Sequence, residues 1–402
     1  MIRILDRAGV GLTVLLPFVL LHGRGVASVV VGLIAAMFLV RSALLRDWRW
    51  VRTWWVVAAL IWWGWLVLCS VRSGTAGEAL LVVRFLLLTA ALEGWLLRDV
   101  AMRTWLGRLL RWSAFYIAAQ SLLQFAVGTN LFGMPRSPDG ELTGPYDKPR
   151  AGPPLAQLLY PAMLPLAATR LRALLVLSGG IAVMVLIGQR MPLLLSFLGL
   201  LVTALMLPRL RGPVLATALA AGLLLAALPV ISPPAAQRIE TKFARQMRDW
   251  PQSPYGKIAA RAVAMVRAHP LAGTGFDGFR YHCEEPAYFQ GWHGDGGGGA
   301  AICVQHPHNY YLQAAVEGGL PGLAAFVALA LCWLRAISRG LGRAPERLRV
   351  GLFVAAVIQL WPIASSTDWV SMPLAGWFSL QLGLALALAR PYMPGRQISF
   401  EA

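Results

Sequence analysis

The chain has 402 residues, of which 57% are hydrophobic and 13% charged, and its mean hydropathy is +0.61. Soluble domains carry roughly 25% charged residues, so this composition excludes a soluble globular protein and predicts a membrane protein. The net charge of +18 does not indicate nucleic-acid binding. Most basic residues lie in short segments between apolar runs, where they orient membrane helices and face lipid headgroups.

Apolar runs predict an all-α polytopic membrane protein with about 12 transmembrane helices, because backbone polar groups must be paired within lipid. No Ala-x-Ala cleavage site separates the first run from the second, so the first run is predicted to remain as an uncleaved span. The predicted spans lie near residues 9–22, 25–41, 51–70, 80–97, 112–127, 154–169, 173–188, 191–207, 213–231, 309–335, 350–365 and 370–390.

The distribution of arginine and lysine predicts the orientation of these spans. With the N-terminus inside, the cytoplasmic segments hold 21 basic residues and the short outer loops hold six. Basic residues collect on the cytoplasmic side of bacterial membrane proteins, so both termini are predicted to be cytoplasmic.

Two segments outside the spans divide the chain. Residues 128–153 form a Pro/Gly-rich outer loop, and residues 232–308 form one large periplasmic loop between the ninth and tenth spans. The large loop is predicted to be partly helical, with a helix at 257–268 that stops at His269-Pro270 before a Gly-rich turn. The predicted organisation is therefore spans 1–9 in residues 1–231, the loop domain 232–308, and spans 10–12 with a cytoplasmic tail in 309–402.

Cys283 and Cys303 share this large loop. In an oxidising compartment such a pair is expected to form a disulfide. The alternative is a zinc site made of both cysteines with His282 and His293, but its spacing matches no standard zinc pattern. No metal site is therefore predicted.

Arginines outside the cytoplasmic segments are candidate ligands for phosphate, which a guanidinium group binds through two parallel hydrogen bonds. Arg190 lies in "LIGQRMPLL", the tightest outer connection, and its alternative role is an interfacial charge that reaches water. Arg261 and Arg267 lie on different faces of the predicted helix 257–268, where a solvated surface is the alternative. Arg84 lies inside a span, which marks a functional candidate, although an ion pair with Glu78 or Glu93 would also explain it.

The stretch "HPHNYYLQAAVEGGLPG", residues 306–322, places polar groups where the tenth span begins. His308 is predicted in the first turn, with Asn309 as a cap and Tyr311 at the interface. Gly319 and Gly322 would break the helix or admit a close neighbour. A capped helix with a kink is the alternative, but a neutral imidazole is also a natural general base near pH 7.

"HNYYLQAAVEGGLPG" resembles the signature of the O-antigen ligase family, which His308, Asn309, Gly319 and Gly322 match without a gap. "GQRMPLL" resembles the segment with that family's first essential arginine, which falls on Arg190. "ARAVAMVRAHPLAGTGFDGF" resembles the segment with the second, which falls on Arg261, with Arg267 as the weaker assignment and Arg84 as a further candidate. The large outer loop between the ninth and tenth spans also matches.

The resemblance implies a GT-C-like, inverting glycosyltransferase of the bacterial inner membrane, with a periplasmic active site and no metal or other cofactor. It implies transfer of a glycan from undecaprenyl pyrophosphate to a sugar hydroxyl of lipid A core in lipopolysaccharide biosynthesis. His308 would be the general base and the arginines would bind pyrophosphate. The expected partners are these two lipid-linked substrates and membrane lipids, and no nucleic acid.

Three alternatives stay open. An O-antigen polymerase or a protein O-oligosaccharyltransferase of the same superfamily would carry the same motifs. A transporter of lipid-linked glycans belongs to a different class and commonly shows repeated halves. No such repeat is visible here, and the candidate polar groups gather on one side of the membrane, which favours chemistry at the surface.

Overall fold

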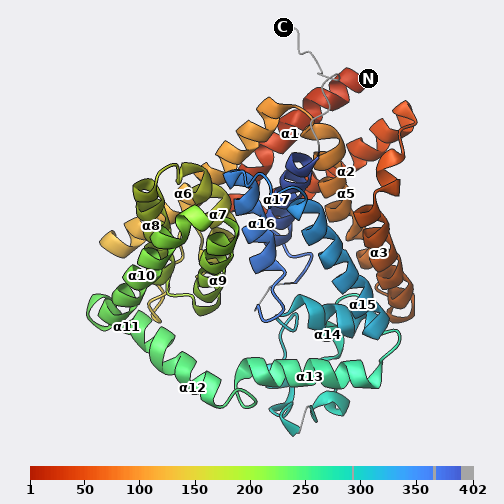
Figure 1. Cartoon of the computed structure of the whole chain (residues 1–402). Helices are drawn as coiled ribbons and strands as arrows, with labels where there is room; N and C mark the ends of the chain where they lie inside the picture. Colours follow the sequence, from red (N-terminus) through yellow and green to blue (C-terminus); the bar gives the residue numbers. More distant parts are fainter. Residues whose placement is uncertain (292–293, 365–367, 391–402) are drawn as a thin grey trace.

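A computed structural model of the chain describes residues 1–291, 294–364 and 368–390. Within these ranges the protein is 75% helical and contains no strand. The helices form a bundle, with the N-terminus at one end (Figure 1). The predicted all-α polytopic fold is confirmed.

Each predicted span coincides with a helix or with a pair of consecutive helices. These are α1 (Ile2–His22), α2 (Arg24–Leu45), α3 (Trp54–Ser73), α4 (Ala76–Leu81) with α5 (Val83–Ala91), α6 (Val100–Val127), α7 (Gly152–Met163), α8 (Arg170–Ile187), α9 (Arg190–Met206), α10 (Arg211–Ile231), α15 (Tyr310–Ser338), α16 (Arg347–Gln359) and α17 (Leu374–Ala389).

The protein is a multi-pass membrane protein, although its helices differ in length. Among the described residues, seven helices are long and apolar enough to cross a membrane, and α9 and α17 are shorter apolar helices. On α10, Leu215, Leu219 and Leu223 follow helical spacing and expose 63–73% of their surface, as lipid-facing side chains do. The number of twelve spans stays a prediction.

Shorter helices form the interior of the bundle. α7 packs against α6 and α16, and α17 packs against α5, α15 and α16. Both α7 and α17 are buried along almost their whole length. The ring of Trp369, which precedes α17, lies 5.2 Å from Phe326 and 5.4 Å from Phe378 between ring centroids. This contact fixes the chain before α17 against α15.

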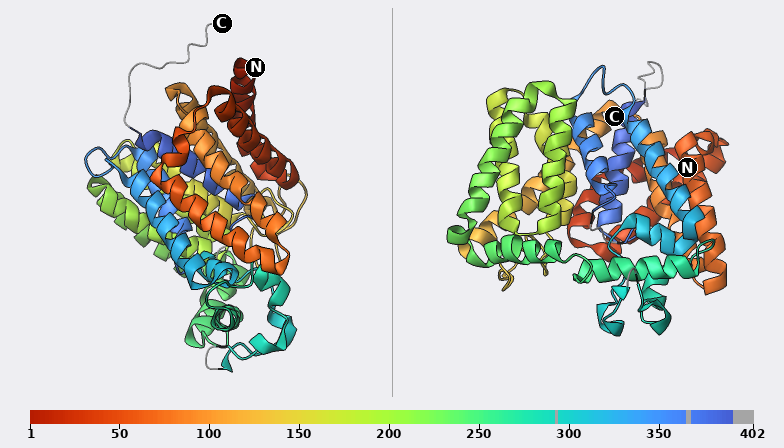
Figure 2. Two further views of the ribbon diagram at one scale, coloured as in Figure 1. Left: turned by 90° about the vertical axis from the view of Figure 1, so that its right-hand side faces the viewer. Right: turned by 60° about the horizontal axis from the view of Figure 1, so that its bottom comes forward.

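Residues 232–308, called the long loop from here on, cross the end of the bundle opposite the N-terminus (Figures 1 and 2). We call this the loop end. The long loop contains α11 (Pro233–Ala236), η5 (Gln237–Lys242), α12 (Phe243–Arg248), α13 (Pro254–Ala268) and α14 (Gly278–His282). The predicted helix is α13; Ser253 caps its first turn by accepting a hydrogen bond from the amide of Gly256, and it ends before His269.

A small second core holds the long loop together. Ile258, Ala262 and Met265 on one face of α13 are buried against Phe279 and Tyr288. Val316 of α15 belongs to the same cluster. The long loop is therefore folded on itself and attached to the outer half of α15.

Candidate functional site at the loop end

The first turn of α15 is fixed to the chain that follows α16. The Oδ1 atom of Asn309 accepts hydrogen bonds from the amides of Tyr311 at 2.9 Å and Leu312 at 3.0 Å, which makes Asn309 the N-cap. Its Nδ2 atom donates to the carbonyl of Pro362 at 2.6 Å, and the Tyr311 hydroxyl donates to the carbonyl of Leu360 at 2.7 Å. Asn309 and Tyr311 thus position the start of the helix.

His308 lies immediately before this cap, not in the first helical turn where the sequence placed it. Its φ of +54° is in the left-handed region, which residues with a side chain rarely adopt. Its ring lies edge-to-face against His306, at 4.6 Å between centroids, and against Tyr255 of α13, at 5.6 Å. Such strained backbone is often found at functional sites.

The helix α15 breaks at Gly319, where φ is +66°. The long loop satisfies the freed backbone groups, because the amides of Thr274 and Gly275 donate to the carbonyls of Val316 and Glu317 at 2.8 and 3.0 Å. A Cβ atom at Gly319 would lie 2.6 Å from the carbonyl oxygen of Pro270. Only glycine fits this contact between α15 and the long loop.

Gly322 allows a second close approach. A Cβ atom there would lie 3.0 Å from the carbonyl of Ala314 and 3.5 Å from Trp65 of α3. The indole of Trp65 donates to the carbonyl of Gly318 at 2.8 Å. The two signature glycines therefore join α15 to the long loop and to α3.

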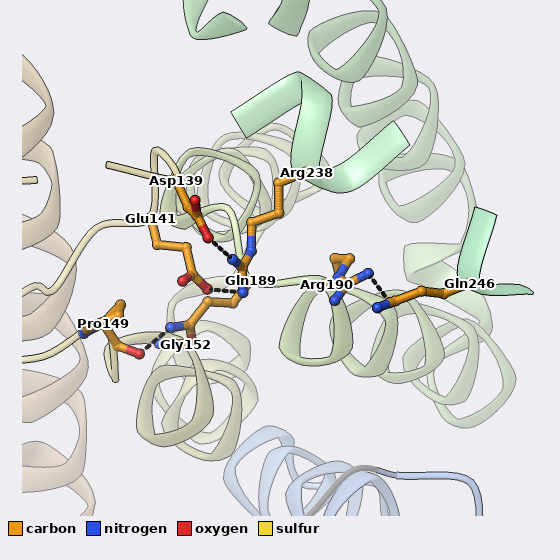
Figure 3. Close-up of polar contacts among 8 residues, drawn as sticks. All are labelled: Asp139, Glu141, Pro149, Gly152, Gln189, Arg190, Arg238 and Gln246. Atoms are coloured by element: carbon orange, nitrogen blue, oxygen red, sulfur yellow. Dashed lines mark hydrogen bonds and ion pairs between the residues drawn. The ribbon is translucent and has the colours of Figure 1, made fainter. Parts of the chain in front are cut away.

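Arg190 begins α9 at the loop end, and its backbone is held by the preceding residue. The side chain of Gln189 accepts from the amide of Gly152 at 3.0 Å and donates to the carbonyl of Pro149 at 2.5 Å. The guanidinium of Arg190 donates to Oε1 of Gln246 in α12 at 2.5 Å (Figure 3). Arg190 is also within electrostatic range of Tyr255, the residue whose ring contacts His308. The structure therefore brings Arg190 and His308 to one region.

A second arginine, Arg238 of η5, lies within electrostatic range of Arg190 and was not predicted from the sequence. Its NH1 and NH2 atoms pair with Asp139 at 2.9 Å and Glu141 at 2.8 Å, both from the loop 128–153 (Figure 3). The only sequence signal was a pair of acids in a loop poor in other charges. That signal does not reveal a partner about a hundred residues away.

Arg261 does not lie open to a phosphate, as its prediction required. It is fully buried, and its guanidinium donates to the carbonyls of Cys283 at 3.0 Å, Gly299 at 2.9 Å and Gly296 at 2.6 Å. The ring of Phe289 covers it at 4.3 Å. In this arrangement Arg261 holds the 283–299 segment in place, because its donors are already engaged.

The two weaker arginine candidates lie in different surroundings. Arg267 is exposed near the end of α13. Arg84 is half-buried in α5, with its guanidinium 5.1 Å from the ring centroid of Phe85. The expected alternative partner Glu93 pairs with Arg390 at 2.9 Å instead. Neither arginine is brought into contact with His308 by any hydrogen bond or ion pair among the described residues.

Cys283 and Cys303 form the expected disulfide, with Cα atoms 5.7 Å apart. This bond consumes both thiols that the alternative zinc site would need, and the His293 of that alternative lies outside the described residues. Arg261 donates to the sulfur of Cys303 at 3.2 Å. The disulfide and Arg261 therefore stabilise the same segment.

Buried carboxylates beside the break in α15 also escaped prediction. Glu317 accepts hydrogen bonds from Gln313 at 3.0 Å and from the amide of Asp277 at 3.1 Å. Gln313 donates to Asp368 at 2.6 Å. Burial and the charge of Asp368 raise the pKa of Asp277 to about 6. A long apolar helix with one glutamate gives no sign of partners from two other segments.

Residues 173–327 match the family model described as O-antigen ligase. A search of curated proteins finds no match. The matched region runs from α8 to the middle of α15, so it includes Arg190, Arg238, Tyr255, His308 and both signature glycines.

Proposed function

Through residues 173–327 the chain belongs to the O-antigen ligase family of membrane glycosyltransferase-type enzymes, and on that premise we propose that it is an O-antigen ligase. It transfers a glycan from undecaprenyl pyrophosphate to a sugar hydroxyl of lipid A core, with inversion at the anomeric carbon. The polyprenyl pyrophosphate is itself the leaving group, and the chain's own side chains supply the catalytic groups.

The observation that supports this proposal is the convergence of Arg190 and His308 on Tyr255. Tyr255 contacts the ring of His308 and lies within electrostatic range of Arg190. A cation and an imidazole are the two groups that displacement of a pyrophosphate by a hydroxyl requires. Arg190 has only a neutral amide, Gln246, as its hydrogen-bond partner, and a phosphate oxygen can replace it.

In the proposed reaction the acceptor oxygen bonds to the anomeric carbon as the bond from that carbon to the pyrophosphate oxygen breaks. His308 takes the proton of the acceptor hydroxyl, a role that typically accelerates a reaction by roughly 10²–10⁴-fold. Arg190 stabilises the negative charge on the departing pyrophosphate. The donor thus leaves as undecaprenyl pyrophosphate, and the proton stays on the imidazole until water removes it.

The loop end faces the periplasm in this proposal, with both termini in the cytoplasm of a bacterial cell and the bundle in the inner membrane. The bias of basic residues toward the other end supports this orientation. The partners are the undecaprenyl-pyrophosphate glycan, the lipid A core and surrounding membrane lipids. Arg261 and the disulfide keep the long loop folded over the bundle, and Arg261 serves the site by position.

The test is transfer by the purified protein, given undecaprenyl-pyrophosphate glycan and lipid A core in the presence of EDTA. Glycan-extended lipid A core is the expected product. Longer lipid-linked chains made from donor alone would identify a polymerase, and a glycosylated peptide acceptor would identify a protein oligosaccharyltransferase. Absence of transfer to any acceptor would overturn the proposal in favour of transport.

A further inference from the structure

The loop end holds two arginines that differ in their partners. Arg190 donates to a neutral amide, whereas Arg238 is paired with two carboxylates. The two guanidinium groups are close enough to interact electrostatically. Two cations gather at one place most favourably when an anion lies between or beside them.

A tight turn delivers the two carboxylates to Arg238. The amide of Gly140 donates to the carbonyl of Ser137 at 2.9 Å, and that of Ser137 donates to the carbonyl of Glu141 at 3.1 Å. Gly140 has a φ of +79°, and a Cβ atom there would lie 2.7 Å from the amide nitrogen of Ala235 in α11. The turn is thus packed onto the helix that precedes Arg238.

The same turn is attached next to Arg190. The amide of Leu142 donates to the carbonyl of Ile187 at 3.1 Å, at the end of α8. A Cβ atom at Gly188 would lie 3.6 Å from the carbonyl oxygen of Gly140. The turn 137–141 therefore lies between the segment that carries Arg190 and the segment that carries Arg238, as Figure 3 shows.

The two carboxylates are not equivalent. The side chain of Glu141 is 9% exposed and that of Asp139 is 60% exposed, while Arg238 is 21% exposed. An ion pair with an exposed carboxylate contributes little, because water competes for both charges. A buried carboxylate has no such alternative, so its pair with arginine persists. Asp139 can therefore release Arg238 easily, and Glu141 cannot.

We propose that Arg238 is a second phosphate-binding residue of the donor site, beside Arg190. Asp139 occupies its NH1 atom when no donor is bound and gives this atom up to a phosphate oxygen. Glu141 keeps its hold on NH2 and so orients the guanidinium toward the ligand. The inference rests on the proposed function and adds to it a second cation for the two phosphates of the donor.

The test measures binding of undecaprenyl pyrophosphate to the purified full-length protein in nanodiscs, with thermal melting to confirm folding. Arg238→Gln is expected to weaken binding about tenfold, the effect of losing one charge-assisted contact, and Arg238→Lys is expected to weaken it less. Arg72→Gln removes an exposed arginine of α3 and is the matched control.

The two carboxylates supply the sharper comparison. Asp139→Asn removes the competitor and is expected to tighten binding several-fold, whereas Glu141→Gln removes the orienting group and is expected to weaken it. Both substitutions remove one negative charge, so a general electrostatic effect would move them in the same direction. Glu284→Gln, at an exposed acid of the long loop, measures that general effect.

Unchanged binding in Arg238→Gln, or the same direction of change in Asp139→Asn and Glu141→Gln, would overturn this inference and leave the proposed function standing. No binding by the wild-type protein, or wild-type binding in Arg190→Gln, would instead count against the proposed function. The two failures are therefore distinct.

Discussion

The amide of Leu320, in the middle of α15, donates a hydrogen bond to the carbonyl of Pro270 in the long loop at 2.8 Å. This bond exists because α15 breaks one residue earlier, at Gly319, and exposes its backbone to the turn that follows α13. The break thereby ties the long loop, which contains Arg261, to the helix that begins next to His308.

Gly319→Ala is expected to destabilise the protein and to reduce transfer. The φ of +66° costs an alanine about 1–2 kcal/mol, and the new methyl group would lie 2.6 Å from Pro270 and Leu271. The apparent melting temperature measures the first effect. Gly64→Ala, on an exposed face of α3 with nothing within 4 Å, is the control and should be neutral. Equal melting of the two variants would contradict this account of the signature glycine.

Arg261→Lys is expected to destabilise the long loop by about 3 kcal/mol, because one ammonium group cannot satisfy three buried carbonyls placed for a guanidinium. Limited proteolysis between residues 283 and 303 should become faster. Arg267→Lys, at an exposed position of the same helix, is the control. A variant that melts like the wild type but binds undecaprenyl pyrophosphate poorly would show that Arg261 contacts the donor after all.

The pH dependence of transfer separates His308 from its neighbour His306. Burial and the nearby His308 lower the pKa of His306 to about 4, so His306 is already unprotonated throughout pH 5–8. A reaction that used His306 as its base would have a flat rate in that window. An ordinary imidazole titrates near ~6.5, so a base at His308 predicts a single-turnover rate that falls toward pH 5. His306→Gln should retain this fall.

Asp277 is expected to make the protein less stable as the pH rises from about 4 to about 6. Its pKa in the folded protein is raised to about 6 by burial and by Asp368, so folding favours the protonated carboxyl and loses that advantage when the group ionises. Asp277→Asn should shrink the difference in apparent melting temperature between pH 5 and pH 7, and asparagine tolerates its φ of +58°. Asp249→Asn, at an exposed acid, should leave the difference unchanged.

The helices could be predicted because apolar length and local breakers determine them. α13 begins after Ser253 and ends before His269, as its apolar spacing and the His-Pro pair indicate. Asn309 caps α15, as a short amide side chain at a helix start does. The disulfide followed from two cysteines in one outer loop. Each of these features depends on residues that lie near one another in sequence.

The roles of the arginines could not be predicted in the same way. Sequence places Arg261 on one face of a helix, but the carbonyls that surround it come from a segment 22–38 residues later. Arg238 meets Asp139 across 99 residues. The left-handed backbone of His308 results from the long loop and α15 meeting at that point. Only tertiary packing decides which charges meet.

The central claim is that Arg190 and His308 serve one transfer reaction in different roles. The most direct measurement follows donor binding and single-turnover transfer together in His308→Ala, with Arg190→Gln as the comparison. The account predicts that His308→Ala binds undecaprenyl-pyrophosphate glycan like the wild type but loses at least about a hundredfold in rate, and that Arg190→Gln binds it weakly. Wild-type turnover in folded His308→Ala would contradict the account.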